Sequence, residues 1–175
     1  SSVESRRIAT ARSVSSDRVA GSSAGEQLEG LLEGGIDLVM IETASDVGHL
    51  LAAVEAARRA CDLPILASLS FDEDLLVADG HSASEAAAAL RAAGVDALGV
   101  NCGSGPIAGI DVLEQMAEAA AGTPLLVMPN AGLPGRVGGQ FVWAATPAYF
   151  AEEVPRFLAA GARLVGGCCG TTPEH

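Results

Sequence analysis

The chain has 175 residues, 49% hydrophobic and 18% charged, with a formal net charge of −12 at pH 7. This length and composition are typical of one soluble globular domain with a substantial core. The negative charge, without any basic cluster, argues against a nucleic-acid partner. No apolar run approaches the roughly 20 residues that span a bilayer, and no signal peptide is recognisable. We therefore expect no membrane association and a cytoplasmic protein with reduced thiols.

The first residues carry weak signals. Residues 1–17 are rich in serine and arginine and predict a poorly anchored lead-in. The domain is predicted to occupy residues 18–175, and the run Arg-Val-Ala-Gly-Ser at 18–22 predicts its first strand.

From residue 25 onward, short apolar runs alternate with alanine- and leucine-rich stretches of helical length. Apolar runs without internal alternation are typical of parallel strands covered on both faces. The predicted strands are 18–22, 38–42, 65–70, 97–102, 125–129 and 163–167. The predicted helices are 25–33, 46–60, 83–93, 107–121 and 147–160.

Alternation of strand and helix indicates βαβ units and a parallel sheet. We predict an α/β fold of the (β/α)₈ TIM-barrel type that is incomplete, with about six of the eight strands. A doubly wound open sheet is the alternative, although there is no Gly-x-Gly-x-x-Gly after a first strand and no P-loop. A capping pattern at residues 171–174 without a following helix indicates that the sequence is cut.

Parallel β/α folds gather function at the carboxyl ends of their strands. The predicted strand ends carry polar or metal-binding side chains, namely Ser22, Glu42, Ser70, Cys102, Asn130, Cys168 and Cys169. Cys61 falls at a helix end on the opposite edge, and we expect it to be structural.

Cys168 and Cys169 are adjacent, and a disulfide between neighbours is strained. The pair alone is equally consistent with ligands for a thiophilic cation such as Zn²⁺ and with small buried apolar residues. With Cys102 at the same edge, three thiols would leave one open position on tetrahedral Zn²⁺, as in catalytic sites. Such an electron-rich centre favours alkylation of a bound thiol over activation of water. Glycines flank these cysteines, and they would either let backbone N–H groups approach the sulfurs or form tight turns.

Four segments occur together: Glu42-Thr43 after an apolar run, Gly-Val-Asn-Cys-Gly at 99–103, Pro-Asn-Ala-Gly at 129–132, and Gly-Gly-Cys-Cys-Gly-Thr at 166–171. This combination closely resembles the homocysteine S-methyltransferase family over about residues 18–175. The family's opening Asp-Gly strand loop and its second strand have no counterpart in the sequence.

The resemblance implies a (β/α)₈ barrel in which Cys102, Cys168 and Cys169 hold Zn²⁺ and the homocysteine sulfur is the fourth ligand. It implies that Glu42 binds the homocysteine amino group and that Asn130 lies near the metal. Ser70, at the end of its strand, is a further candidate for substrate binding. The alternatives are an interior charge paired with a helix terminus for Glu42 and a turn residue for Asn130.

The reaction implied is zinc-dependent transfer of a methyl group to the homocysteine thiol, which forms methionine. The donor could be methyltetrahydrofolate through cobalamin, betaine or S-methylmethionine. An alternative is a catalytically inactive zinc- or homocysteine-binding fragment that associates through exposed barrel edges. A metal-free barrel lyase with Glu42 as base is a third, disfavoured alternative.

Overall fold

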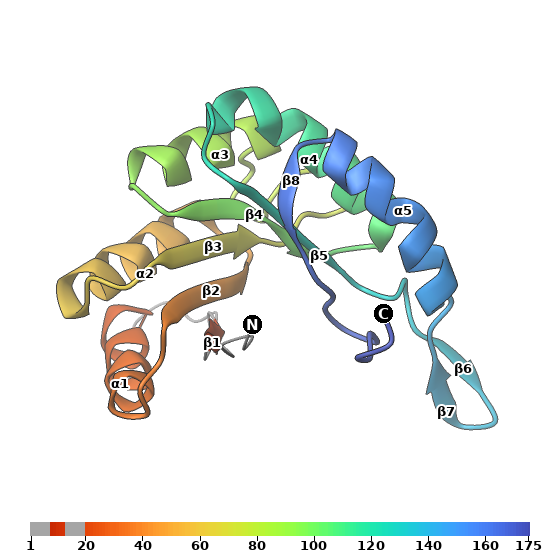
Figure 1. Cartoon of the computed structure of the whole chain (residues 1–175), viewed down its shortest axis with the longest axis horizontal. Coiled ribbons are helices and arrows are strands. Elements are labelled where there is room, and N and C mark those ends of the chain that lie inside the picture. Colours follow the sequence, from red (N-terminus) through yellow and green to blue (C-terminus); the bar gives the residue numbers. More distant parts are fainter. Residues whose placement is uncertain (1–7, 13–19) are drawn as a thin grey trace, which may run out of the picture.

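Six parallel strands form one sheet in the computed structural model, which describes residues 8–12 and 20–175 (Figure 1). Their order in the sheet is their order in the chain. A doubly wound sheet reverses its strand order at a switch point, so this order excludes that alternative. The strands are β1 (Ile8–Arg12), β2 (Leu38–Ala44), β3 (Ile65–Leu69), β4 (Ala97–Cys102), β5 (Leu125–Pro129) and β8 (Ala162–Val165).

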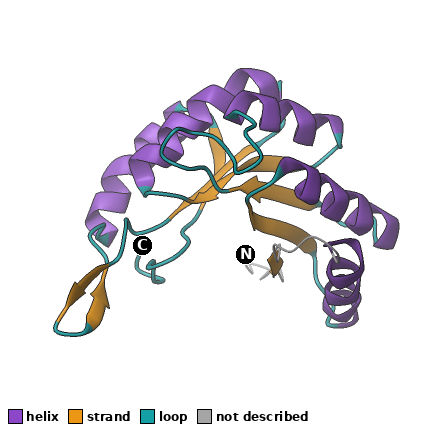
Figure 2. Cartoon of the chain, turned by 180° about the vertical axis from the view of Figure 1, so that it is seen from behind, coloured by secondary structure: helices purple, strands orange, loops and turns teal. Residues whose placement is uncertain are grey.

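The helices cover one face of this sheet. The sheet is curved, the helices lie along its convex side, and none of the described helices covers its concave side (Figures 1 and 2). The predicted α/β fold of an incomplete barrel is therefore confirmed, together with the five helices and five of the six strands. The helices are α1 (Ala20–Glu33), α2 (Val47–Ala60), α3 (Ala83–Ala92), α4 (Pro106–Ala120) and α5 (Pro147–Ala159).

The predicted first strand at 18–22 is wrong. Residues 20–22 begin α1, and residues 18 and 19 lie outside the described residues. Ser22 is therefore not at a strand end. The sixth strand is instead β1, inside the segment that was predicted to be a lead-in, and it pairs with β2 from Ile8 opposite Leu38 to Arg12 opposite Glu42. Its strand conformation depends on this pairing, because its five residues alone carry little strand signal.

A small antiparallel hairpin was also not predicted. It consists of β6 (Gly135–Val137) and β7 (Gln140–Val142) and projects from the body of the molecule (Figure 1). Gly138 and Gly139 join the strands with φ of 59° and 84°, and positive φ at both positions is what a type I′ hairpin turn requires.

Side chains of the sheet alternate between two apolar layers. One layer packs beneath the helices around fully buried Leu50, Leu90, Leu113 and Phe157. The other faces the concave side, where it lines a cavity of about 270 Å³. Its lining includes Leu38, Met40, Leu66, Leu126, Met128 and Leu164, and Leu164 remains 40% exposed. The concave face is thus apolar and only partly covered.

Side-chain caps start three helices close to the carboxyl edge of the sheet. Asp46 accepts a hydrogen bond from the backbone N–H of His49 in α2, and Thr146 caps α5 immediately before Pro147. The predicted capping box of Ser82 and Glu85 at α3 is confirmed. Each cap pairs backbone N–H groups that would otherwise lack partners. The caps thereby determine where the loops at the carboxyl edge of the sheet end and the helices begin.

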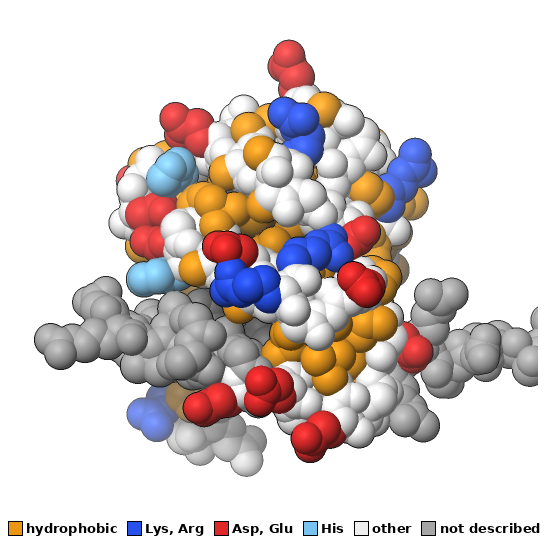
Figure 3. Space-filling model, turned by 90° about the vertical axis from the view of Figure 1, so that its left-hand side faces the viewer, with side chains coloured by type: hydrophobic (Ala, Val, Ile, Leu, Met, Phe, Trp, Pro, Cys, Tyr) orange, Lys and Arg blue, Asp and Glu red, His pale blue; other side chains and the backbone are white. Residues whose placement is uncertain are grey.

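Acidic and basic side chains are interspersed on the face shown in Figure 3. Among the described residues, three arginines are paired with carboxylates: Arg58 with Asp96, Arg59 with Glu55, and Arg156 with Glu153. Within residues 8–12 and 20–175, no helix combines the length and apolar character needed to cross a bilayer.

We predict that Gly99→Ala destabilises the fold by about 2 kcal/mol or more, because a side chain there overpacks the sheet. A Cβ at Gly99 in β4 would lie 1.9 Å from the carbonyl oxygen of Leu126 in β5. The measurement is urea unfolding followed by circular dichroism. Gly30→Ala is the control, since a Cβ there meets no atom within 4 Å, and it should be neutral or stabilising. Equal stability of the two variants would contradict the close approach of β4 and β5.

Candidate metal centre

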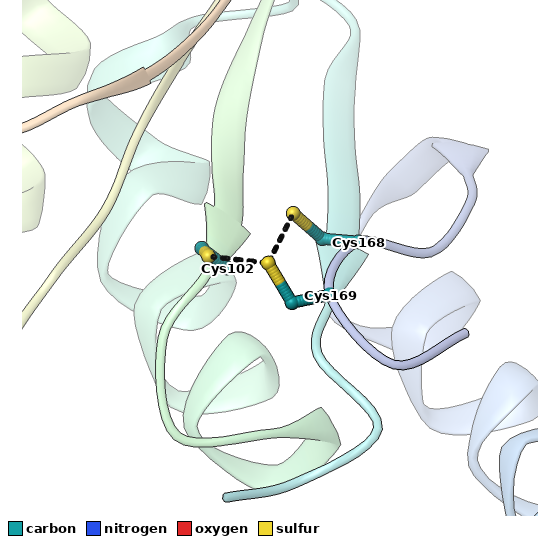
Figure 4. Close-up of side chains that lie close together, drawn as sticks. All are labelled: Cys102, Cys168 and Cys169. Carbon is teal, nitrogen blue, oxygen red and sulfur yellow. Dashed lines mark hydrogen bonds between the residues drawn. The ribbon is translucent and has the colours of Figure 1, made fainter. Parts of the chain in front are cut away.

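Three cysteine sulfurs meet at the carboxyl edge of the sheet (Figure 4). The Sγ atoms of Cys102 and Cys169 are 3.8 Å apart, those of Cys168 and Cys169 are 4.0 Å apart, and all three lie within 4.8 Å of one another. In the part of the chain that the structure describes, this is the only group of three side chains placed to share a metal ion.

The sulfur positions fit a tetrahedral zinc ion. Zinc–sulfur bonds of about 2.3 Å at tetrahedral angles place neighbouring sulfurs about 3.8 Å apart. The separations of 3.8 Å between Cys102 and Cys169 and of 4.0 Å between Cys168 and Cys169 match that edge length. All three thiols are free, and Cys169 is exposed while Cys102 and Cys168 are half-buried. The trio therefore offers three soft donors and leaves a side open to solvent.

The end of β5 holds all three cysteines in place through backbone hydrogen bonds. The N–H of Asn130 donates to the carbonyl of Cys102, the N–H of Cys168 donates to Pro129, and the N–H of Ala131 donates to Cys169. These contacts continue the pairing of β4 with β5 and of β5 with β8 beyond the strands. Residues 129–131 are thus the common scaffold for Cys102 and for the adjacent pair Cys168 and Cys169, which begins 66 positions further along the chain.

The side chain of Asn130 strengthens the same scaffold. Its Nδ2 donates to the carbonyl of Gly103 at 2.7 Å, and its Oδ1 accepts from the N–H of Cys169 at 3.1 Å. Both ends of the amide are engaged with the two loops that carry the cysteines. Asn130 therefore lies beside the sulfur trio and bridges the two loops, and its role toward a metal or substrate stays a prediction.

Left-handed backbone and glycines shape the two loops. Cys102 and Gly103 follow one another with φ of 65° and 71°, which turns the chain sharply at the end of β4. Left-handed backbone at a non-glycine residue is strained and concentrates at functional sites. Gly170 allows the Trp143 ring to cover the cysteine loop, because a Cβ at Gly170 would lie 2.1 Å from the ring. Gly166 donates its N–H to the carbonyl of Val127, so this N–H extends the pairing of β5 with β8 and does not contact a sulfur.

Burial raises the pKa of the Cys102 thiol to about 12, and the neighbouring sulfurs of Cys168 and Cys169 add to the shift. Without a cation, Cys102 is therefore a neutral thiol at physiological pH. A divalent cation reverses this preference, because it stabilises the thiolates that burial and mutual repulsion disfavour.

One important residue was missed by sequence reasoning. Asn101 is fully buried, and its Nδ2 lies 3.7 Å from the Sγ of Cys168. The same amide bonds to Thr43 in β2 and to Ser68 in β3. The available signal was a polar asparagine inside the apolar strand run, one position before Cys102, whereas the predicted site residues were those at the strand ends.

The remaining predicted site residues lie at different distances from the trio. Glu42 is half-buried near the end of β2, one residue before Thr43, and is thereby connected to the trio through Asn101. Ser70 follows β3 at the same edge, where its N–H donates to Ala44. No contact joins Glu42 or Ser70 to a sulfur among the described residues, so their roles stay predictions.

Cys61 caps the far end of α2, with its Sγ 3.5 Å from the carbonyl of Ala57, on the edge opposite the trio.

In metal-free protein, we predict that Cys102 is alkylated by iodoacetamide at mildly alkaline pH more slowly than Cys169. The thiolate is the reacting form, and the raised pKa of Cys102 keeps the thiolate scarce, whereas Cys169 is exposed. Site-resolved mass spectrometry measures both rates. Because the pKa is raised, the Cys102 rate should keep increasing with pH well above pH 9. A Cys102 rate equal to or above that of Cys169 would contradict the burial.

The fold and the thiol site together define a β/α barrel-type protein with a candidate thiolate metal centre at the carboxyl edge of its sheet. The family model described as homocysteine S-methyltransferase matches residues 11–175. The methionine synthase of Mycobacterium leprae is 38% identical over 158 residues, which cover 86% of this chain and 13% of that protein. The chain belongs to the homocysteine S-methyltransferase family.

Solved structures agree. The apo form of the homocysteine methyltransferase MmuM from Escherichia coli superposes with a TM-score of 0.78 and 25% identity, covering 96% of this chain and 59% of that one. The metallated form of the same enzyme gives a TM-score of 0.70 and 26% identity, covering 90% and 50%. The chain therefore spans 13% of the methionine synthase and 59% or less of MmuM, which is under two thirds in each case.

Proposed function

We propose that this chain takes part in methyl transfer to the thiol of homocysteine, with Zn²⁺ held by Cys102, Cys168 and Cys169. The observation that carries the proposal is the meeting of these three sulfurs at spacings suited to tetrahedral zinc. Family membership and the metallated form of MmuM support it. Zinc, when bound, would supply the positive charge that keeps a substrate thiol deprotonated and nucleophilic at neutral pH.

The chain's own residues would bind and orient the substrate. Glu42 offers a carboxylate for the amino group of homocysteine, and its half-buried position would strengthen that attraction relative to bulk water. Ser70 offers a hydroxyl at the same edge of the sheet. The three cysteines would be metal ligands, with Cys169 on the exposed side where a substrate sulfur could approach. The product would be methionine.

The proposal also concerns the class of methyl donor and the cellular compartment. Methyltetrahydrofolate through cobalamin fits the likeness to methionine synthase, whereas betaine and S-methylmethionine remain the other donors to test. Thiolate ligands require reduced cysteines, and all four cysteines are free, which is compatible with a cytoplasmic setting.

A second candidate is a catalytically inactive zinc- or homocysteine-binding fragment. The observation that favours it is the open, apolar concave face, whose cavity is lined by Leu38, Met40 and Leu164. Such a fragment would associate through the free edges of β1 and β8 with strands that complete the barrel.

We predict that purified protein binds one equivalent of zinc and that Cys102→Ser reduces the bound zinc severalfold or more, because it removes one of three protein ligands. Zinc content is measured by inductively coupled plasma mass spectrometry after dialysis against trace metal. Cys61→Ser is the matched control and should bind as much zinc as the original protein, since Cys61 lies on the opposite edge. Loss of zinc in both variants, or absence of zinc in the unaltered protein, would contradict the site.

Zinc affinity should increase from about pH 6 to about pH 8, because the thiols must lose their protons to bind the metal. The raised pKa of Cys102 strengthens this competition by protons over the whole interval. Competition with a chromophoric chelator at each pH measures the affinity. An affinity that does not change with pH would mean that thiolates are not the ligands.

Methionine formation separates the two candidate functions. Zinc-loaded protein is incubated with homocysteine and each donor class, and methionine is measured by mass spectrometry. Turnover with one donor that is lost in Glu42→Gln supports the transferase. Zinc and homocysteine binding without turnover under any donor would favour the inactive fragment.

A further inference from the structure

Asn101 lies at the centre of a buried hydrogen-bond network that joins β2, β3 and β4 to the loop after β8. Its Oδ1 accepts from the N–H of Thr43 at 2.8 Å and from the Oγ of Ser68 at 2.7 Å. Its Nδ2 donates to the Oγ1 of Thr43 at 2.6 Å and to the Sγ of Cys168 at 3.7 Å. The side chain has no exposed surface. Every donor and acceptor of this amide is therefore engaged, and its orientation is determined by its partners.

Thr43 is the strained partner in this network. Its φ is 59°, and a β-branched residue in the left-handed region is an outlier that the surrounding structure must hold in place. Two hydrogen bonds to Asn101, one from its backbone and one to its hydroxyl, supply that restraint. The strand register shifts between Ile41 and Ala44 at the same point. The direction of Glu42, one residue earlier, depends on this bulge.

We propose that Asn101 is a positioning residue that couples the metal ligand Cys168 to the Glu42–Thr43 segment. The inference rests on the proposed function and adds a residue to it. The amide N–H stabilises charge on the Cys168 sulfur and fixes its direction, as partners of metal ligands commonly do. The other contacts of the same amide hold Thr43 in its left-handed conformation. The metal side and the substrate side of the site thereby share one rigid group.

Asn101→Asp is the sharpest test of the sulfur contact. It keeps the size of the side chain and the oxygen that accepts from Thr43 and Ser68, but it replaces the donor that faces the sulfur with a carboxylate oxygen. We expect zinc affinity to fall about tenfold or more, the range seen when partners of metal ligands are lost. Chelator competition measures the affinity, and the cobalt-substituted protein should show a shifted sulfur-to-cobalt charge-transfer band.

Ser68→Ala is the matched control, because it removes another hydrogen bond to the same buried amide and leaves the sulfur contact in place. It should leave the zinc affinity and the cobalt band unchanged, even if it lowers the unfolding midpoint in urea. Equal zinc affinities for Asn101→Asp, Ser68→Ala and the unaltered protein would overturn the proposal. The proposal would also be overturned if zinc affinity fell in both variants in proportion to their loss of stability in urea. Failure of the unaltered protein to bind zinc would instead count against the proposed function itself.

Thr43→Val tests the coupling independently and does not depend on the folding of Asn101→Asp. It removes the hydroxyl that accepts from Asn101 and retains the β-branched shape. We expect homocysteine to bind the zinc-loaded variant severalfold more weakly by calorimetry, with zinc affinity unchanged, because Glu42 loses its restraint while the sulfur contact remains. Unchanged homocysteine affinity would show that the Asn101 network does not reach the substrate side and would overturn the proposal.

Discussion

The closeness of three sulfur atoms, all within 4.8 Å of one another, is the constraint on which the site depends. Three thiolates at this spacing repel one another, so the group is stable only with protons retained or with a cation shared between the sulfurs. The parallel sheet creates this closeness. Pairing of β4, β5 and β8 in sequence brings the carboxyl ends of distant segments to one edge, and the end of β5 binds the backbone of all three cysteines.

Two asparagine side-chain amides stabilise this edge of the sheet, each through different hydrogen bonds. Asn130 joins the loop after β4 to the loop after β8, and so sets the distance between Cys102 and Cys169. Asn101 joins Cys168 to the strained Thr43 beside Glu42. Because a buried amide is costly unless all its groups are paired, each network is either complete or strongly destabilising. This requirement explains how a site on loops can keep a defined geometry.

Much of the architecture could be predicted from the sequence, because its helices and parallel strands have distinct apolar patterns. Because function gathers at the carboxyl ends of parallel strands, the sequence also predicts that Cys102, Cys168 and Cys169 lie at one edge of the sheet. Three features could not be read this way. β1 depends on pairing with β2 and not on its own residues. The β6–β7 hairpin was not predicted, although the pair Gly138-Gly139 is typical of a two-residue hairpin turn. The Asn101 network depends on which face of a strand a side chain occupies, and on contacts with residues 33 and 58 positions away.

The most direct test of the central claim is the zinc K-edge X-ray absorption spectrum of the purified, zinc-loaded chain. The account predicts three sulfur neighbours at about 2.3 Å, with a fourth sulfur appearing when homocysteine is added. A first shell made only of nitrogen and oxygen, or a sulfur shell that homocysteine leaves unchanged, would contradict the claim that these three cysteines form a metal centre for a substrate thiol.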